Sequence, residues 1–168
     1  AESEAILEYL EECFPAPPLL PGSAQKRARA RYLARLHDLH LEPRVRALFP
    51  LVRDTTRRAT LGELAAALDE RIRLIERTAD PEGPFLAGHE LSLADCGFAV
   101  SLPLAGLILE HLGQAFDLPP RLRIWQQAVQ EHPAVATGLT PWRAATEAWL
   151  SSARTPSMFV GLTSVPKM

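Results

Sequence analysis

The chain has 168 residues, of which 47% are hydrophobic and 23% charged, and its formal net charge is −2. These values are typical of one globular domain that buries its core without disulfides or metal. The small negative charge argues against a dedicated nucleic-acid-binding protein, which needs a basic excess. The two cysteines lack metal-ligand or CxxC spacing, which argues against a disulfide framework and fits a reducing cytosol.

The first segment, residues 1–13, has the pattern of an amphipathic helix. Ile6, Tyr9, Leu10 and Cys13 fall on one face at helical spacing, and glutamates take the opposite face. Cys13 is expected to pack rather than to react, because a helix C-terminus disfavours a thiolate.

Residues 14–23 hold four prolines and a glycine and predict a stiff, extended linker. Ser23 is placed to cap a helix that runs from Ala24 to about Pro43, where proline should kink or end it. Its predicted apolar stripe consists of Ala28, Tyr32, Leu36 and Leu39.

A basic run covers residues 26–35, with Arg27, Arg31 and Arg35 on one stripe. Three explanations are open: a nucleic-acid patch, attraction of an anionic ligand, and ion pairing with the acidic first helix. We favour ion pairing, because the charges of the two helices mirror each other.

The middle of the chain predicts a long amphipathic helix over residues 61–78. Its apolar residues follow the i, i+3, i+4, i+7 rule, and Thr60 with Glu63 forms a candidate capping box. The sequence DPEGP at 80–84 is a turn signal, and Gly88 can adopt a positive φ.

The stretch Leu91–Leu109 predicts the central helix of the domain. Ser92 and Asp95 form a second candidate capping box, and the helix beyond is apolar on all sides, as a buried helix is. A membrane span is disfavoured, because the run is short for spanning and contains Asp95 and Pro103. Asp95 is read as a structural cap with a lowered pKa, since backbone donors hold it, and therefore as a weak base.

Further helices are predicted from Pro120 and from Thr140, with a short helical turn over 132–139 between them. Residues 153–168 have no clear period and are expected to form a tail. No segment alternates as a strand does, so the predicted fold class is all-α.

Three motifs in order resemble the glutathione transferase superfamily, in its bacterial or zeta-like form. Residues 2–10, ESEAILEYL, resemble the last helix of that family's thioredoxin-like domain, and FPAPPLLP at 14–21 resembles its interdomain linker. The FLAG-x-x-LSLAD motif at 85–95 is similar to the N-capping box of its central helix. The resemblance therefore implies four parts: the terminal helix of a truncated thioredoxin-like domain (1–13), a linker (14–23), an all-helical C-terminal domain (24–152) and a tail (153–168).

The resemblance also implies site residues. Glu2 and Ser3 would bind the γ-glutamyl end of glutathione, and Tyr32, Leu36 and Leu39 would border the site of a hydrophobic electrophile. The family's catalytic Ser, Tyr or Cys belongs to a part of the thioredoxin-like domain upstream of Ala1, so no catalytic residue is expected among these 168.

A metal site is conceivable at His37 and His40, with Asp38 and Glu42 close by. No second cluster completes a coordination shell, so no metal site is predicted.

The expected function is conjugation of glutathione, the co-substrate, to an electrophilic small molecule by a cytoplasmic homodimer. Neither nucleic acid nor a membrane is an expected partner. The alternative is a transferase-like helical module that binds or assembles without catalysis.

Overall fold

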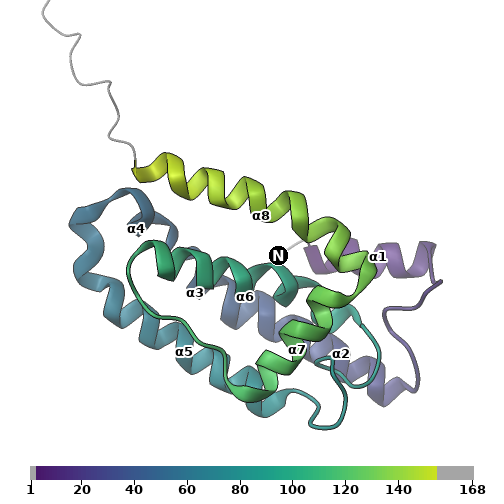
Figure 1. The fold of residues 1–168 in the computed structure, drawn as a ribbon. Helices are drawn as coiled ribbons and strands as arrows, with labels where there is room; N and C mark the ends of the chain where they lie inside the picture. The colour runs from purple at the N-terminus through teal and green to yellow at the C-terminus, as the bar shows by residue number, and fades with distance from the viewer. Residues whose placement is uncertain (1–2, 155–168) are drawn as a thin grey trace, which may run out of the picture.

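The computed structural model describes residues 3–154, which fold into a helical bundle (Figure 1). Within this range there is no β-strand, and the isolated bridge Phe85–Gly88 closes a loop turn. The elements in chain order are α1 (Ser3–Cys13), α2 (Ala24–Leu36), the π-helix η1 (His37–Leu41), α3 (Glu42–Arg46), α4 (Phe49–Arg53), the 3-10 helix η2 (Thr55–Thr60), α5 (Leu61–Thr78), α6 (Leu93–His111), α7 (Pro120–Glu131) and α8 (Pro133–Arg154).

Helix α6 runs through the centre of the bundle, and α2, α7 and α8 pack around it (Figure 1). Phe98, Leu102, Ala105 and Ile108 have no exposed surface, so the helix forms the middle of the core. By length and composition α6 could cross a membrane, with a mean hydropathy of 1.6 over the apolar window. However, 61% of that window is buried inside the fold, as in the core helix of a globular protein.

The start of α6 is organised by the carboxylate of Asp95, whose side chain is fully buried. Ser92 and Asp95 form a capping box, in which Oδ2 accepts from the Ser92 backbone N–H (2.8 Å) and hydroxyl (3.0 Å). Oδ1 accepts from the backbone N–H of Leu86 (2.9 Å) and from Nε1 of Trp125 in α7 (2.8 Å). One side chain thereby joins α6, the preceding loop and α7.

A second polar junction fastens the same loop to α5 and α7. The Glu76 carboxylate accepts from the backbone N–H groups of Arg121 (3.1 Å) and Leu122 (3.0 Å), so α5 supplies the cap of α7. The Arg121 guanidinium donates to the carbonyls of Asp80 (2.6 Å), Pro84 (3.3 Å) and Phe85 (2.6 Å). The loop between α5 and α6 is thus held at several points along its length.

Three predicted details of the helices are wrong. Thr60 does not cap α5: η2 leads directly into α5, so Thr60 has helical dihedral angles, and its hydroxyl donates to the Arg57 carbonyl instead. The predicted break near Thr140 is absent, because α8 continues through Pro141. A proline removes one helical hydrogen bond without preventing the helix from continuing.

The third correction concerns the inward face of α2. The buried residues are Ala30, Leu33, Ala34 and Leu36, whereas Tyr32 is 54% exposed and Ala28 is exposed too. The π-helix η1 changes the helical phase beyond Leu36, and Leu39 is 59% exposed. A single α-helical period from Ala24 to Pro43 could not represent that change.

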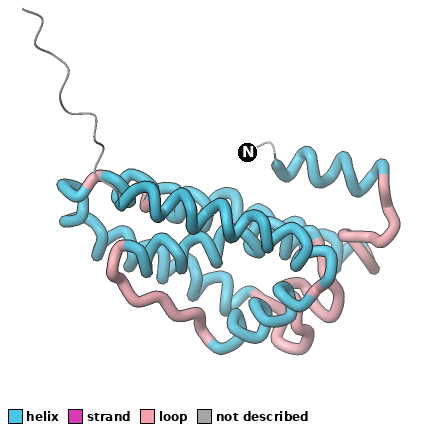
Figure 2. Tube along the Cα trace, turned by 45° about the horizontal axis from the view of Figure 1, so that its top comes forward, coloured by secondary structure: helices cyan, strands magenta, loops and turns pink. Residues whose placement is uncertain are grey.

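Helix α1 lies at the edge of the bundle, joined to α2 by the linker (Figure 2). Its apolar residues Ile6, Tyr9 and Leu10 are exposed, as is Cys13, so the expectation that Cys13 packs is wrong. Glu4 is buried instead, which means that α1 turns much of its acidic face toward the bundle.

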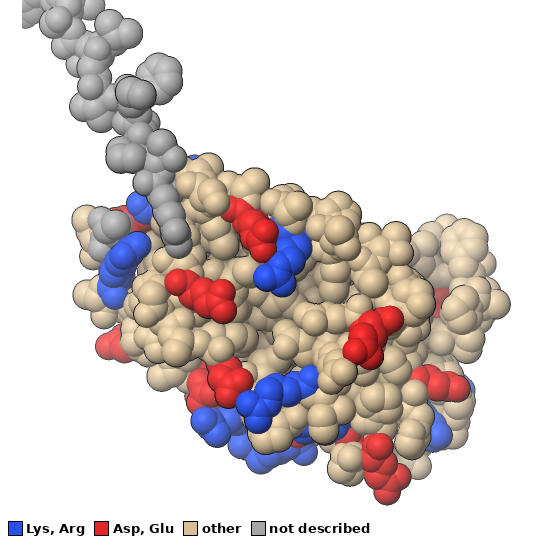
Figure 3. Space-filling model, viewed as in Figure 1, with Lys and Arg blue, Asp and Glu red and all other residues tan. Residues whose placement is uncertain are grey.

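Acidic and basic side chains are interspersed on the face of the bundle drawn in Figure 3. Several are paired along one helix, among them Arg73 with Asp69 (2.8 Å) and Arg143 with Glu147 (2.9 Å). Such exposed i, i+4 pairs each contribute about 0.3–0.5 kcal/mol. The stability of the fold therefore rests on the core and on the buried junctions.

Asp95→Ala tests the junction at the start of α6. The change leaves the buried Trp125 Nε1–H and Leu86 N–H without an acceptor and removes the cap, so we expect a loss of about 3 kcal/mol or more in unfolding free energy, measured by urea denaturation. Asp117→Ala is the matched control, because its side chain is 78% exposed and pairs with Arg123; a change below about 0.5 kcal/mol is expected. Equal, small losses in both variants would show that Asp95 is not a junction.

Candidate functional site

The start of α1 is where the sequence placed the glutathione contacts. Ser3 is the first residue of α1 and is exposed, while Glu2 lies outside the residues that the structure describes. A helix start presents backbone N–H groups without intrahelical partners, which suits a ligand carboxylate.

Helix α1 is held against the bundle by charged side chains. The Arg31 guanidinium donates to the Glu8 carboxylate through Nε (2.6 Å) and Nη2 (3.0 Å). The Glu11 carboxylate accepts from the backbone N–H groups of Leu19 and Leu20, both at 2.9 Å. The Leu19 carbonyl in turn accepts from the backbone N–H of Leu93, so the linker connects α1 to the start of α6. The acidic and basic helices therefore pair through Glu8 and Arg31.

Charged groups gather where the start of α1 meets the end of α2 and the π-helix. Burial raises the pKa of Glu4 above its ordinary value; the negative charge of Asp38 raises it further, and Arg35 opposes both. The Arg35 Nη1 lies 3.6 Å from Oδ2 of Asp38, whose side chain is 4% exposed. Ser3 therefore adjoins a corner with two carboxylates and one guanidinium.

His37 is a buried residue of this corner. Its Nε2 lies 2.8 Å from the hydroxyl oxygen of Ser101 in α6, and its Nδ1 lies 3.0 Å from Oδ1 of Asp38. The ring contacts Gly97 so closely that a Cβ there would lie 2.5 Å from Nδ1. His40, three residues on, is exposed. The sequence suggested a pair of histidines, and the structure separates them.

The three residues predicted to border the electrophile site differ in exposure. Leu36 is 5% exposed and belongs to the core, whereas Tyr32 and Leu39 face outward. Tyr32 and Leu39 therefore remain available to a ligand or another protein surface, whereas Leu36 is enclosed by the core.

Asp95 has no free face for chemistry, because four donors surround it and its side chain is fully buried. The capping position predicted a lowered pKa for Asp95. Burial instead raises the pKa of Asp95, and its hydrogen bonds oppose that rise only in part. Its role is structural. Glu76 and Arg121, which complete the neighbouring junction, were missed by the sequence argument because no local motif marks a contact 41 or 46 residues away.

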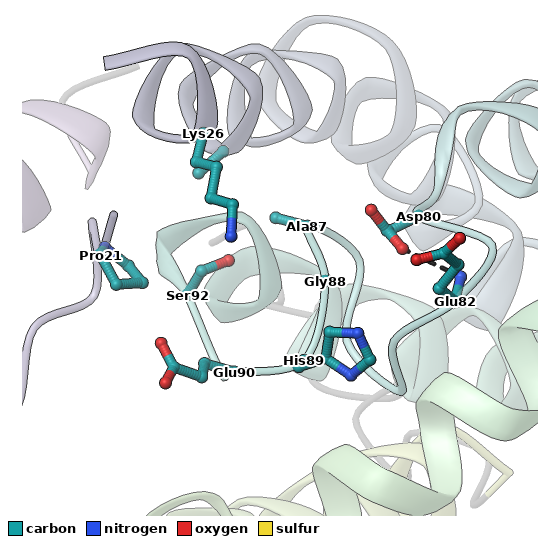
Figure 4. Close-up of a pocket in the computed structure, with 10 residues that line it drawn as sticks. Pro21, Lys26, Asp80, Glu82, Ala87, Gly88, His89, Glu90 and Ser92 are labelled. Atoms are coloured by element: carbon teal, nitrogen blue, oxygen red, sulfur yellow. Dashed lines mark hydrogen bonds between the residues drawn. The ribbon is translucent and has the colours of Figure 1, made fainter. Parts of the chain in front are cut away.

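A surface cavity of about 340 Å³ lies between α2 and the loop before α6 (Figure 4). Lys26 extends into it from α2, and Asp80, Glu82, His89 and Glu90 contribute from the loop. Asp80 is occupied in a turn, where its Oδ1 accepts from the N–H groups of Glu82 (2.9 Å) and Gly83 (3.2 Å). Three carboxylates against one lysine make this cavity unsuited to an anionic ligand.

The cysteines differ in environment. Burial, together with the negative charges of Asp95 and Glu4, raises the pKa of Cys96 to about 11, which makes it a poor nucleophile near neutral pH. Cys13 is exposed at the end of α1.

No protein-family model matches the chain. Over 139 residues it is 31% identical to maleylacetoacetate isomerase of Pseudomonas aeruginosa, an alignment that covers 79% of this chain and 62% of that protein. The chain thus spans less than two thirds of the length of this relative.

Two solved structures resemble the fold. Maleylacetoacetate isomerase from Anaeromyxobacter dehalogenans, with dicarboxyethyl glutathione and citrate bound in its active site, matches with a TM-score of 0.62 and 28% identity, covering 81% of this chain and 61% of that one. Maleyl pyruvate isomerase, a bacterial zeta-class glutathione S-transferase, matches with a TM-score of 0.61 and 26% identity, covering 81% and 66%.

Gly97→Ala tests the close packing of His37 on α6. In an open helix position Gly→Ala stabilises by up to about 1 kcal/mol, but here the added methyl group would collide with the imidazole, so we expect a loss of about 1–3 kcal/mol in unfolding free energy. Gly138→Ala in α8 is the control, because no atom lies within 4 Å of its added Cβ, and this change should stabilise. Stabilisation of similar size in both variants in thermal and urea unfolding would refute the close contact.

Proposed function

We propose that the chain belongs to the glutathione transferase superfamily and forms the helical part of an enzyme that joins the glutathione thiol to an electrophilic small molecule. In that reaction the thiol loses its proton, and the sulfur forms a bond to an electron-poor carbon of the substrate. Either a leaving group departs from that carbon as its anion, or a carbon–carbon double bond is opened and the neighbouring carbon takes up a proton. The group that stabilises the thiolate is a Ser, Tyr or Cys of a thioredoxin-like domain upstream of Ala1.

The exposed apolar face of α1 is the observation that carries this proposal. Ile6 is 57% exposed and Tyr9 64%, and Phe14, directly after the helix, is 70% exposed. The acidic face of the same helix is engaged by Arg31 and the linker. A helix held by its charged face leaves apolar surface that another domain must cover. A thioredoxin-like domain, of which α1 is the last helix, supplies that cover.

Glutathione binds at the start of α1 in this proposal. The Ser3 hydroxyl and the free backbone N–H groups of the first turn receive the γ-glutamyl carboxylate, and Glu2 receives the ammonium group. The glutathione derivative named for the Anaeromyxobacter dehalogenans structure, which shares 28% sequence identity, supports the choice of glutathione.

Tyr32 and Leu39 border the electrophile, whereas Leu36 is enclosed by the core. The names of the relatives favour a second candidate reaction, glutathione-dependent isomerisation of maleyl compounds. It begins with the same thioether bond, formed at a carbon–carbon double bond; after rotation, elimination restores the double bond and releases glutathione. A transferase-like module that binds without catalysis is the remaining alternative.

The enzyme is a cytoplasmic homodimer in this proposal, and α1 and α2 lie along the subunit interface. The support is the ion pair between Glu8 and Arg31, which joins α1 to α2, so that the two helices can meet a second subunit together.

Isothermal titration of glutathione into the product of the whole reading frame, with Ser3→Ala as the variant, tests the proposal. We expect binding by the parent protein and a roughly tenfold increase in Kd in the variant, because about 1.4 kcal/mol of hydrogen bonding to a charged group is lost. Ser151→Ala, an exposed serine of α8, is the matched control and should leave Kd unchanged.

Turnover assays separate the two reactions and the alternative. Consumption of glutathione in the presence of a generic aryl halide indicates conjugation. Cis–trans conversion of a maleyl acid without net consumption of glutathione indicates isomerisation. Glutathione binding with neither turnover leaves the non-catalytic module. Absence of glutathione binding, or equal Kd values for Ser3→Ala and the parent protein, would reject the assigned site.

A further inference from the structure

The π-helix brings together three side chains that the proposed reaction does not use. One ligand atom from each of His37, Asp38 and Glu42 lies within 4.8 Å of the other two. Imidazole nitrogen and carboxylate oxygen are both donors that Zn²⁺ binds in proteins.

The wide turn of η1 makes this grouping possible. The backbone N–H of Glu42 donates to the His37 carbonyl, an i→i+5 bond, so Glu42 stands one π-turn beyond His37. In an α-helix, residues three or four apart share a face, and residues five apart do not. Single π-turns within helices occur frequently at functional sites. The α-helical spacing of the sequence therefore pointed to His37 and His40, whereas the fold pairs His37 with Glu42.

Asp38 provides an independent sign of a missing ligand. Its side chain is 4% exposed, yet Oδ2 accepts no hydrogen bond from the described residues, and Arg35 Nη1 stands 3.6 Å away. A buried carboxylate oxygen without a hydrogen bond is costly, so it calls for a cation or a donor.

The far ring nitrogen of His37 has a hydrogen-bond partner, as that of a metal-binding histidine does. With the proton on Nε2, the ring donates to the Ser101 hydroxyl at 2.8 Å, and the lone pair of Nδ1 faces Asp38. A partner on the far ring nitrogen orients the ligating nitrogen and sets its tautomer. Gly97 gives the ring its space.

We propose that His37 Nδ1, Asp38 and Glu42 bind one divalent metal ion such as Zn²⁺. With ligand distances of about 2.1 Å, two ligand atoms at right angles around an ion are about 3 Å apart. The separation of 3.0 Å between Nδ1 and Asp38 Oδ1 fits that arrangement. Binding requires the tautomer of His37 with its proton on Nε2. Water completes the coordination.

Two arginines compete with the ion for the carboxylates. Arg46 donates to Glu42 at 2.6 Å, and Arg35 stands beside Asp38; their side chains are 67% and 51% exposed. Both can turn to solvent, where exposed pairs contribute little. Removing the Arg46 charge should therefore strengthen metal binding, a result that a merely structural cluster would not give.

The test is titration of the chelator-treated whole protein with Zn²⁺ by calorimetry, and with Co²⁺ by visible absorption. We expect one equivalent to bind, with Kd increased at least tenfold in Glu42→Gln and decreased in Arg46→Gln. His40→Gln is the matched control, since this exposed histidine of the same π-helix is not one of the proposed ligands. The Kd of this variant for Zn²⁺ should equal that of the parent protein. The Glu42 side chain is partly exposed, whereas His37 is buried, so the Glu42 variant should fold even where His37→Gln does not.

An unchanged Zn²⁺ affinity in Glu42→Gln would place the ion elsewhere and overturn the proposal. The absence of binding at millimolar Zn²⁺ would overturn it as well. Glutathione binding by the same variants is measured in parallel. A protein that binds Zn²⁺ but not glutathione would contradict the proposed function and leave the metal site standing.

Discussion

The buried carboxylate of Asp95 is the interaction on which the rest of the structure depends. It accepts from the cap residue of α6, from the loop that precedes α6, and from the indole of Trp125 in α7. Burying a charge is unfavourable unless hydrogen bonds replace water, and here four donors do so. Glu76 caps α7, and Arg121 binds backbone carbonyls of the loop between α5 and α6. These contacts make the loop a fixed part of the bundle. This rigidity gives α6 a defined start, against which the linker and α1 are placed.

The fold positions the candidate site through charged contacts together with the apolar packing of Leu7 and Leu20 on the core. Helix α1 is attached by Glu8 to Arg31 and by Glu11 to the linker amides. Its first residue, Ser3, is exposed next to the corner that contains Glu4 and Asp38. The helix therefore presents its N-terminus and its apolar face at the same time, which are the two surfaces that a glutathione site and an adjoining domain need.

The sequence predicted the elements whose signals are local. The bounds of α5, the capping box of α6 and the all-helical fold class follow from spacing and from residues three positions apart. The orientation of α1 did not follow, because the rule that apolar residues face inward assumes that the chain supplies all of the surrounding surface. The π-helix was also unpredictable from an α-helical period, so Leu36 and Leu39 were placed on one face, although one is buried and the other exposed. Contacts such as those of Arg121 and Glu76 depend on the fold and leave no mark at fixed spacing.

Hydrogen–deuterium exchange of the whole protein, with and without saturating glutathione, tests the central claim that the start of α1 binds glutathione. We expect slower exchange in the protein segment 3–10 when glutathione is present. Exchange should not change in the loop at 80–90, which lines the cavity next to α2. Slower exchange at 80–90, together with unchanged exchange at 3–10, would contradict that claim.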